Sequence, residues 1–108
     1  MPSSTILRGN VKDYFVCNPS LTPTAVTGTS SSQTFTVAGL LTTDIVNVNY
    51  NGGAQTAGIS IANDYVSAAN MLTIQFINSS GSSATPAAGN YLVEVLRTDG
   101  LPIAVNAG

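Results

Sequence analysis

Two stretches of the chain decide its fold: residues 71–78 read MLTIQFIN, and residues 90–97 read NYLVEVLR. Every second residue in each stretch is apolar, namely Leu72, Ile74 and Phe76 in the first and Tyr91, Val93 and Val95 in the second. Successive side chains of a strand point to opposite faces of its sheet. The spacing therefore predicts two strands that each turn one face toward a core.

Shorter stretches on both sides of this pair predict further strands, at residues 11–17, 33–37, 45–50, 58–66 and 101–106. The clearest is residues 45–50, where Val46, Val48 and Tyr50 share one face and asparagines occupy the other. Pro102 confines the last of these strands to a sheet edge or a terminus, because proline lacks the backbone N–H that a ladder needs.

Turn residues separate the predicted strands. The Asn51-Gly52 pair is typical of a tight hairpin turn and predicts a hairpin across residues 51–57. Residues 67–70 predict the next corner, and residues 20–32 and 78–89 read as connecting loops. An alternative reading places one or two helical turns at residues 62–72, with Asn63 as their cap.

Together these elements predict an all-β fold, an antiparallel β-sandwich or small barrel of six to eight short strands. Residues 1–10 read as an extended N-terminal arm, because their two adjacent apolar residues lie among turn formers. Residues 11–108 are then expected to form a single β domain. With 108 residues, the chain has the size of one small domain with one core.

Charge is scarce in this chain, and its scarcity excludes several functions. It has three basic residues, five acidic residues and no histidine, for a net charge of −2. Nucleic acid and anionic membranes both require clustered lysine or arginine, so neither is an expected partner. The longest apolar run, Tyr14 to Cys17, is far shorter than a membrane span or the core of a secretory signal. Serine, threonine, asparagine and glycine cover the surface instead.

No group of residues predicts catalysis, a cofactor or a metal site, and we expect the protein not to be an enzyme. Cys17 ends an apolar strand and has no histidine to activate it, so it reads as a small buried hydrophobe. Asp44, Asp64 and Asp99 lie beside predicted turns, where aspartate bonds neighbouring backbone N–H groups. No aspartate cluster has calcium-loop spacing. Glu94 and Arg97 are expected to pair on a sheet surface or between subunits.

Both strong strands carry apolar residues on their second face as well. Met71 and Ile77 lie opposite the core face of the first strand, and Leu92 and Leu96 lie opposite that of the second. A sandwich buries only one face of each sheet, and the chain has a single lysine with which to protect exposed edges. We therefore expect neighbouring protein copies or a larger scaffold to cover these faces. Partial exposure of single apolar side chains is the alternative.

The order and spacing of three segments resemble a known class of proteins. The segments are TFTVAGLLTTDIV at residues 34–46, VSAANMLTIQFIN at residues 66–78 and TPAAGNYLVEV at residues 85–95. They are similar to small β-sandwich virion proteins of tailed bacteriophages, including head decoration or cement proteins. Related-looking domains also occur in phage tails and fibres.

The resemblance implies a non-enzymatic protein on the outer surface of a phage capsid, made in the cytoplasm of the bacterial host. Proteins of this kind commonly form trimers, and their terminal arms grip adjacent subunits of the major capsid protein. This sequence then offers Ile6, Leu7 and Arg8 as the partner-binding residues of the arm. The alternatives are a tail or fibre module, and a host-glycan-binding domain that uses exposed tyrosines, such as Tyr50 or Tyr65, and asparagines to bind a glycan.

Overall fold

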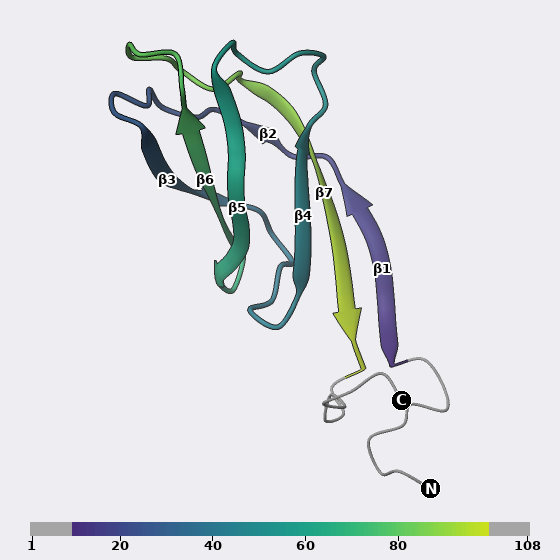
Figure 1. Ribbon diagram of the computed structural model, residues 1–108. Coiled ribbons are helices and arrows are strands. Elements are labelled where there is room, and N and C mark those ends of the chain that lie inside the picture. The colour runs from purple at the N-terminus through teal and green to yellow at the C-terminus, as the bar shows by residue number, and fades with distance from the viewer. Residues whose placement is uncertain (1–9, 100–108) are drawn as a thin grey trace, which may run out of the picture.

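The computed structural model describes residues 10–99, which form seven antiparallel strands in two sheets (Figure 1). The strands are β1 (Val11–Cys17), β2 (Ser20–Leu21), β3 (Ser30–Thr36), β4 (Ile45–Tyr50), β5 (Ile59–Ala68), β6 (Met71–Asn78) and β7 (Gly89–Thr98). The predicted all-β fold is confirmed, in the arrangement of a small sandwich. Residues 1–9 of the predicted arm and the strand predicted at residues 101–106 lie outside the described residues.

The first sheet is organised around β7, which pairs with three other strands. β1 lies along one edge of β7, and β2 continues along that edge after Pro19, whose carbonyl accepts from the backbone N–H of Tyr91. β4 pairs with the opposite edge. Val93 shows the register, because it lies opposite Cys17 of β1 and Val48 of β4.

In the second sheet, β6 lies between β3 and β5. A two-residue turn joins β5 to β6, because Ala68 pairs directly with Met71. Asn70 in this turn has a φ of 65°, a left-handed conformation that asparagine tolerates better than most residues. The corner predicted at residues 67–70 is therefore confirmed as a tight hairpin.

The core lies between the two sheets, and the two central strands supply most of its largest side chains. Leu72, Ile74 and Phe76 of β6 and Tyr91, Val93 and Val95 of β7 are all fully buried. Loop residues fill the ends of the core: Val26 is joined to Ala84 by paired backbone hydrogen bonds near the end of β6, and Leu40, whose carbonyl accepts from Asn70 N–H, is buried near its start. The period of two in the sequence thus identified the core faces of both strands correctly.

The hairpin predicted at residues 51–57 is wrong. β4 pairs with β7 and β5 pairs with β6, so the loop between β4 and β5 crosses from one sheet to the other. The favoured hairpin turn needs positive φ at both central residues, but Asn51 does not have it. Gly52 instead allows a close approach, since a Cβ there would lie 2.1 Å from the Tyr50 hydroxyl oxygen.

Three smaller expectations also need correction. The alternative helix at residues 62–72 does not form, because β5 and β6 pair along that stretch. Residues 20–32, read as a loop, contain β2 and the start of β3. β3 also ends at Thr36 rather than Val37. In each case pairing with a partner strand decides the conformation, and local propensity does not.

Replacing Val93 by aspartate is expected to abolish cooperative thermal unfolding. Val93 is fully buried between β1 and β4, and an unpaired charge placed there would be too costly to bury. The matched control is Val16→Thr on the neighbouring strand, where the side chain is 52% exposed and an uncharged substitute does not repel Glu94 opposite it. Its free energy of unfolding should stay within about 0.5 kcal/mol of the parent. Circular dichroism melting curves compare the two, and a parental transition in Val93→Asp would contradict this assignment of the core.

Candidate interaction face

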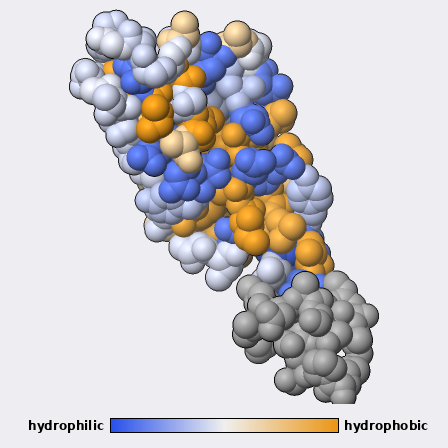
Figure 2. All heavy atoms as spheres, in the orientation of Figure 1, coloured by the Kyte–Doolittle hydropathy of each residue, from blue (hydrophilic) through white to orange (hydrophobic). Residues whose placement is uncertain are grey.

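The side of the first sheet that turns away from the core is largely apolar. We call it the outer face, and it is formed by Tyr14 and Val16 of β1, Ile45, Asn47 and Asn49 of β4, and Leu92, Glu94 and Leu96 of β7. Tyr14, Val16 and Ile45 are all more than half exposed. Figure 2 shows apolar residues gathered where β4, β7 and β1 run. Exposed apolar residues that adjoin one another in this way mark interaction surfaces.

A shallow hollow of about 220 Å³ lies in the outer face. Strand register explains it, because Leu96 of β7 pairs with both Tyr14 of β1 and Ile45 of β4. These three side chains therefore stand in one row across the sheet, with Asn47 and Glu94 beside them. The row forms an apolar surface of aliphatic and aromatic side chains against which a partner side chain can pack.

Glu94 is the one charged side chain in this hollow. Its carboxylate accepts a hydrogen bond from the Tyr14 hydroxyl at 2.5 Å and one from the Asn47 side-chain amide at 3.4 Å. The bond to Glu94 raises the pKa of Tyr14 above its ordinary value. Within residues 10–99, Glu94 has no ion-pair partner. Alternation places Arg97 on the other side of β7, so the two residues predicted to serve surface or intersubunit pairing do not pair with each other within one copy.

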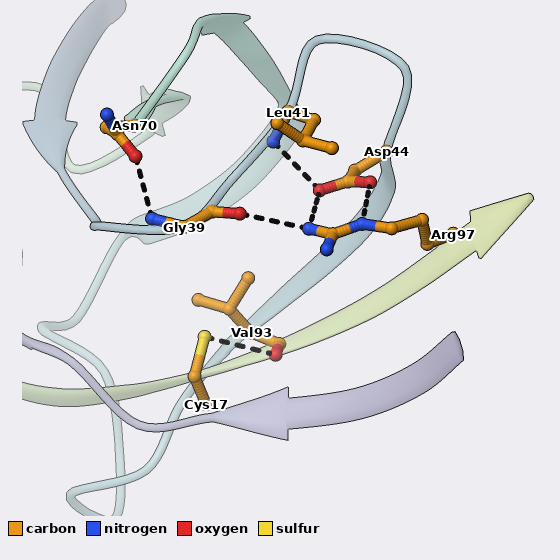
Figure 3. Close-up of polar contacts among 7 residues, drawn as sticks. All are labelled: Cys17, Gly39, Leu41, Asp44, Asn70, Val93 and Arg97. Atoms are coloured by element: carbon orange, nitrogen blue, oxygen red, sulfur yellow. Dashed lines mark hydrogen bonds and ion pairs between the residues drawn. The ribbon is translucent and has the colours of Figure 1, made fainter. Parts of the chain in front are cut away.

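Arg97 instead fastens the loop between β3 and β4 to the first sheet (Figure 3). Its Nε and Nη2 atoms donate to the two carboxylate oxygens of Asp44, each at 2.8 Å, and Nη2 also donates to the Gly39 carbonyl. Asp44 in turn accepts from the backbone N–H of Leu41 at 2.9 Å. The Phe15 ring lies 5.3 Å from the guanidinium carbon, within cation–π range. This network holds the loop between β3 and β4 against the side of β7 that is opposite the outer face.

The remaining predicted sites are structural. Asp44 bonds a turn N–H as expected, whereas Asp64 lies inside β5 and accepts from Val48 N–H of β4 at 3.3 Å. Burial raises the pKa of Asp64. Cys17 is half-buried, donates to the Val93 carbonyl at 3.7 Å and has a pKa raised by burial. Asp99 donates its backbone N–H to the Asn10 carbonyl.

The second sheet presents a different outward side. Thr34, Thr73 and Ser67 form a ladder of hydroxyl hydrogen bonds across β3, β6 and β5, each 2.8 Å long. Met71 and Ile77 lie on this side, as predicted, and are partly buried among serine and threonine neighbours. Such a surface is well solvated by water. Of the two sheets, only the first has an outward side dominated by exposed apolar side chains.

The two tyrosines of the glycan alternative do not share a surface. Tyr65 lies on the hydroxyl-rich side of the second sheet, opposite Thr73. Tyr50 belongs to the first sheet, packs on Tyr91 with ring centroids 5.0 Å apart and lies against Gly52. An open hollow of about 410 Å³ between β4 and β5 includes Tyr50, together with Asp64 and three side-chain amides. Tyr50 and Tyr65 therefore lie at two separate positions, and of the two only Tyr50 shares its hollow with asparagine side chains.

Residues 78–80, Asn-Ser-Ser, fit the sequence pattern for N-glycosylation, but the Asn78 side chain is used for folding. Asn78 is buried, and its amide nitrogen donates to the carbonyls of Val26 and Ser82 at 3.0 and 2.8 Å. Its amide oxygen accepts from the backbone N–H and hydroxyl of Ser80. The side chain that would carry a glycan is thus fully engaged and inaccessible in the folded chain.

Other functional features are absent from the part of the chain that the structure describes. Residues 10–99 contain no group of three or more histidine, cysteine, aspartate or glutamate side chains positioned to hold a metal ion. The same residues include no helix with the length and hydrophobicity required to span a bilayer. The predicted arm residues Ile6, Leu7 and Arg8 lie outside this range. No family model, curated protein or solved structure matches the chain.

Replacing Asp44 by asparagine is expected to lower the free energy of unfolding by about 2 kcal/mol at pH 7, because charge-assisted bonds to Arg97 are lost. Those bonds lower the pKa of Asp44 in the folded chain. The stabilisation is therefore complete above the unfolded-state pKa of about 4 and is lost as the pH falls through the lower folded-state pKa. Urea unfolding should show the difference between parent and variant shrinking below about pH 4. A difference that does not change with pH would contradict the role of the ion pair.

Proposed function

We propose that this chain is a non-enzymatic structural protein of a tailed-phage virion, a head decoration or cement protein that binds the outside of the capsid and bridges neighbouring subunits. The observation that carries the proposal is the apolar outer face, which lies on a molecule whose other outward surface is rich in hydroxyl groups. The resemblance of residues 34–97 to such proteins supplies the biological setting. The proposed location is therefore the virion surface, after synthesis in the host cytoplasm.

The chemistry of the outer face suits permanent attachment to a protein scaffold. Burial of apolar area contributes roughly 25 cal/mol per Å² before the costs of association. A face with so little charge makes contacts that salt screens only weakly. Repetition of the same modest contact over a closed shell strengthens attachment through avidity. The major capsid protein is therefore the proposed partner, and other virion proteins are the next candidates.

The arm, residues 1–10, adds the second proposed contact. Its residues Ile6 and Leu7 offer apolar side chains, and Arg8 offers one of only three basic groups in the chain. An extended segment that adds to a sheet edge gains direction from backbone hydrogen bonds without needing many charges. The arm would hold a neighbouring subunit while the outer face rests on the shell.

An aspartate in place of Ile45 is expected to abolish binding to capsid shells assembled without this protein. Ile45 is 60% exposed in the outer face, so a charge there blocks docking while leaving the core intact. The matched control is Tyr65→Asp, at a position 48% exposed on the opposite sheet, which should bind like the parent. Bound copies are counted after sedimentation of the shells. Equal loss in both variants would contradict the choice of face, and binding of the parent to tail tubes or glycans alone would favour an alternative function.

Deletion of residues 1–10 is expected to leave the domain folded but to weaken its attachment to the shell at least about tenfold. Within the described residues the core cluster begins at Leu21, after the deleted segment, and loss of one of two linked contacts lowers avidity steeply. The same sedimentation assay measures attachment, and a melting curve confirms folding. Equal binding by the shortened protein would remove the arm from the proposal.

A further inference from the structure

The hollow in the outer face combines apolar walls with one carboxylate. Tyr14, Ile45 and Leu96 line it, and Glu94 and Asn47 stand beside them. Tyr14 and Ile45 are 63% and 60% exposed, so a partner side chain can reach the hollow. A carboxylate among apolar groups restricts what can cover it, because burial without a counter-charge is strongly unfavourable.

The Glu94 carboxylate has unused capacity to accept hydrogen bonds. Oε2 accepts from the Tyr14 hydroxyl at 2.5 Å. The Asn47 amide nitrogen lies 3.4 Å from Oε1, outside the usual range of about 2.7–3.2 Å, and a carboxylate can accept about four bonds in all. Within residues 10–99, the Asn47 amide oxygen accepts no hydrogen bond. Glu94 Oε1 and Asn47 Oδ1 are therefore two neighbouring acceptors available to a donor from outside.

Neither basic side chain of the described region neutralises Glu94. Arg97 donates to Asp44 on the opposite side of β7. Lys12 is an exposed residue at the point where the register between β1 and β7 shifts, and it forms no ion pair with Glu94. We therefore expect the protein that covers the outer face to supply the cation.

Strand register sets the length of the side chain that fits. Leu96 stands in one row with Tyr14 and Ile45, and Glu94 stands with Asn47 in the next row of the same face. Successive rows of one face are about 7 Å apart along a strand. Lysine has a four-carbon stem that extends about 6 Å from Cα to Nζ. A stem that crosses the apolar row thus delivers its ammonium to the row that holds the two acceptors.

The bond from Tyr14 distinguishes between the two long basic side chains. Arginine recognises a carboxylate best when it donates to both oxygens at once, but Oε2 of Glu94 already accepts from the Tyr14 hydroxyl. The lysine ammonium is a compact charge with three donors. Two of them suffice for Glu94 Oε1 and Asn47 Oδ1. The arrangement therefore favours lysine.

We propose that the protein that binds the outer face inserts one lysine side chain into this hollow, packs its stem on the apolar row and bonds its ammonium to Glu94 and Asn47. The inference rests on the proposed function and names the side chain by which the shell is held. Apolar groups around the pair exclude water, which strengthens a charge-assisted bond. A surface without a cation at this point would bury Glu94 uncompensated, so the hollow also provides specificity.

Neutralising Glu94 tests the inference, because a partner with a lysine and a partner without a cation predict opposite results. Glu94→Gln keeps the shape of the side chain and should weaken binding to capsid shells at least about tenfold. A partner without a cation would bind this variant as tightly as the parent or more tightly, since the buried charge is gone. Sedimentation with shells over a concentration series measures binding. Unchanged or tighter binding by Glu94→Gln would overturn the inference.

The matched control for Glu94→Gln is Asp13→Asn. Both variants change the net charge by the same amount. Asp13 is an exposed residue of β1 that lies opposite Arg97, and alternation therefore places it on the side away from the hollow. Asp13→Asn should bind shells like the parent. Melting curves confirm that both variants fold.

Modifying the shell identifies the partner side chain. Acetylation removes the charge of lysine, whereas methylation keeps it. The parent should bind acetylated shells at least about tenfold more weakly and methylated shells like unmodified ones. The residual binding of Glu94→Gln should not respond to acetylation, because both changes remove the same pair. Electron micrographs confirm that the modified shells are intact. Full binding of the parent to acetylated shells would overturn the choice of lysine.

A small probe tests the hollow in the full-length protein without any shell. n-Butylammonium reproduces a lysine side chain from Cβ to Nζ, and n-butanol is its uncharged counterpart. In an NMR titration, the ammonium should shift the methyl signals of Ile45 and Leu96, and Glu94→Gln should reduce its affinity severalfold. Equal shifts with the alcohol would overturn the inference. Binding of the ammonium only after Arg8→Gln would also overturn it, because Arg8 of the protein itself would then fill the hollow.

Failure of this inference is distinguishable from failure of the proposed function. If shells bind the parent and Glu94→Gln equally, the shell-binding proposal stands and the lysine contact fails. If the ammonium binds in the hollow but no shell binds the parent, the hollow stands as a site for a basic side chain and the capsid proposal fails.

Discussion

Every strand of the first sheet depends on backbone pairing with β7. β1 and β2 share one edge of it and β4 occupies the other, so a single ten-residue strand pairs with residues as much as 87 positions away in the chain, as Val11 and Thr98 show. The inward side chains of β7 complete the core, and its outward side chains form the centre of the outer face. The stability of the domain and the character of its exposed surface are therefore set by alternate residues of one strand.

The two outward surfaces solve the scarcity of charge in different ways. On the second sheet, threonine and serine hydroxyls bond to one another and to water, so β-branched side chains cover the sheet without ions. On the first sheet, aliphatic and aromatic groups remain exposed around one carboxylate. The two outward surfaces therefore differ in chemistry: the hydroxyl-rich one is suited to contact with solvent, and the apolar one is suited to contact with protein.

Local patterns predicted what depends on local geometry. The bounds of the strands at residues 11–17, 45–50 and 71–78 match because a period of two and flanking turn residues are both readable in the sequence. The false hairpin at Asn51-Gly52 arose because a turn signal cannot tell which strand its successor will pair with. Glu94 was visible as the polar centre of an apolar face, but its contact with Tyr14 depends on the register between β1 and β7. The sequence predicted that Asp64 lies beside a turn. Its hydrogen-bond partner, the Val48 N–H, belongs to the other sheet, and a local pattern cannot show that contact.

The hydrogen bond between Asn10 and Asp99 puts both ends of the described chain at the same end of the β1–β7 ladder. A pulling force applied through the two ends would break these ladder hydrogen bonds one after another, starting at Asn10 and Asp99. A sheet resists this direction of force poorly, because only one bond carries the load at a time. A force spread across the flat of the sheet loads many bonds together. Under the proposed capsid role, a shell under internal pressure would therefore be reinforced more by contacts across the whole outer face than by a force carried through the chain ends.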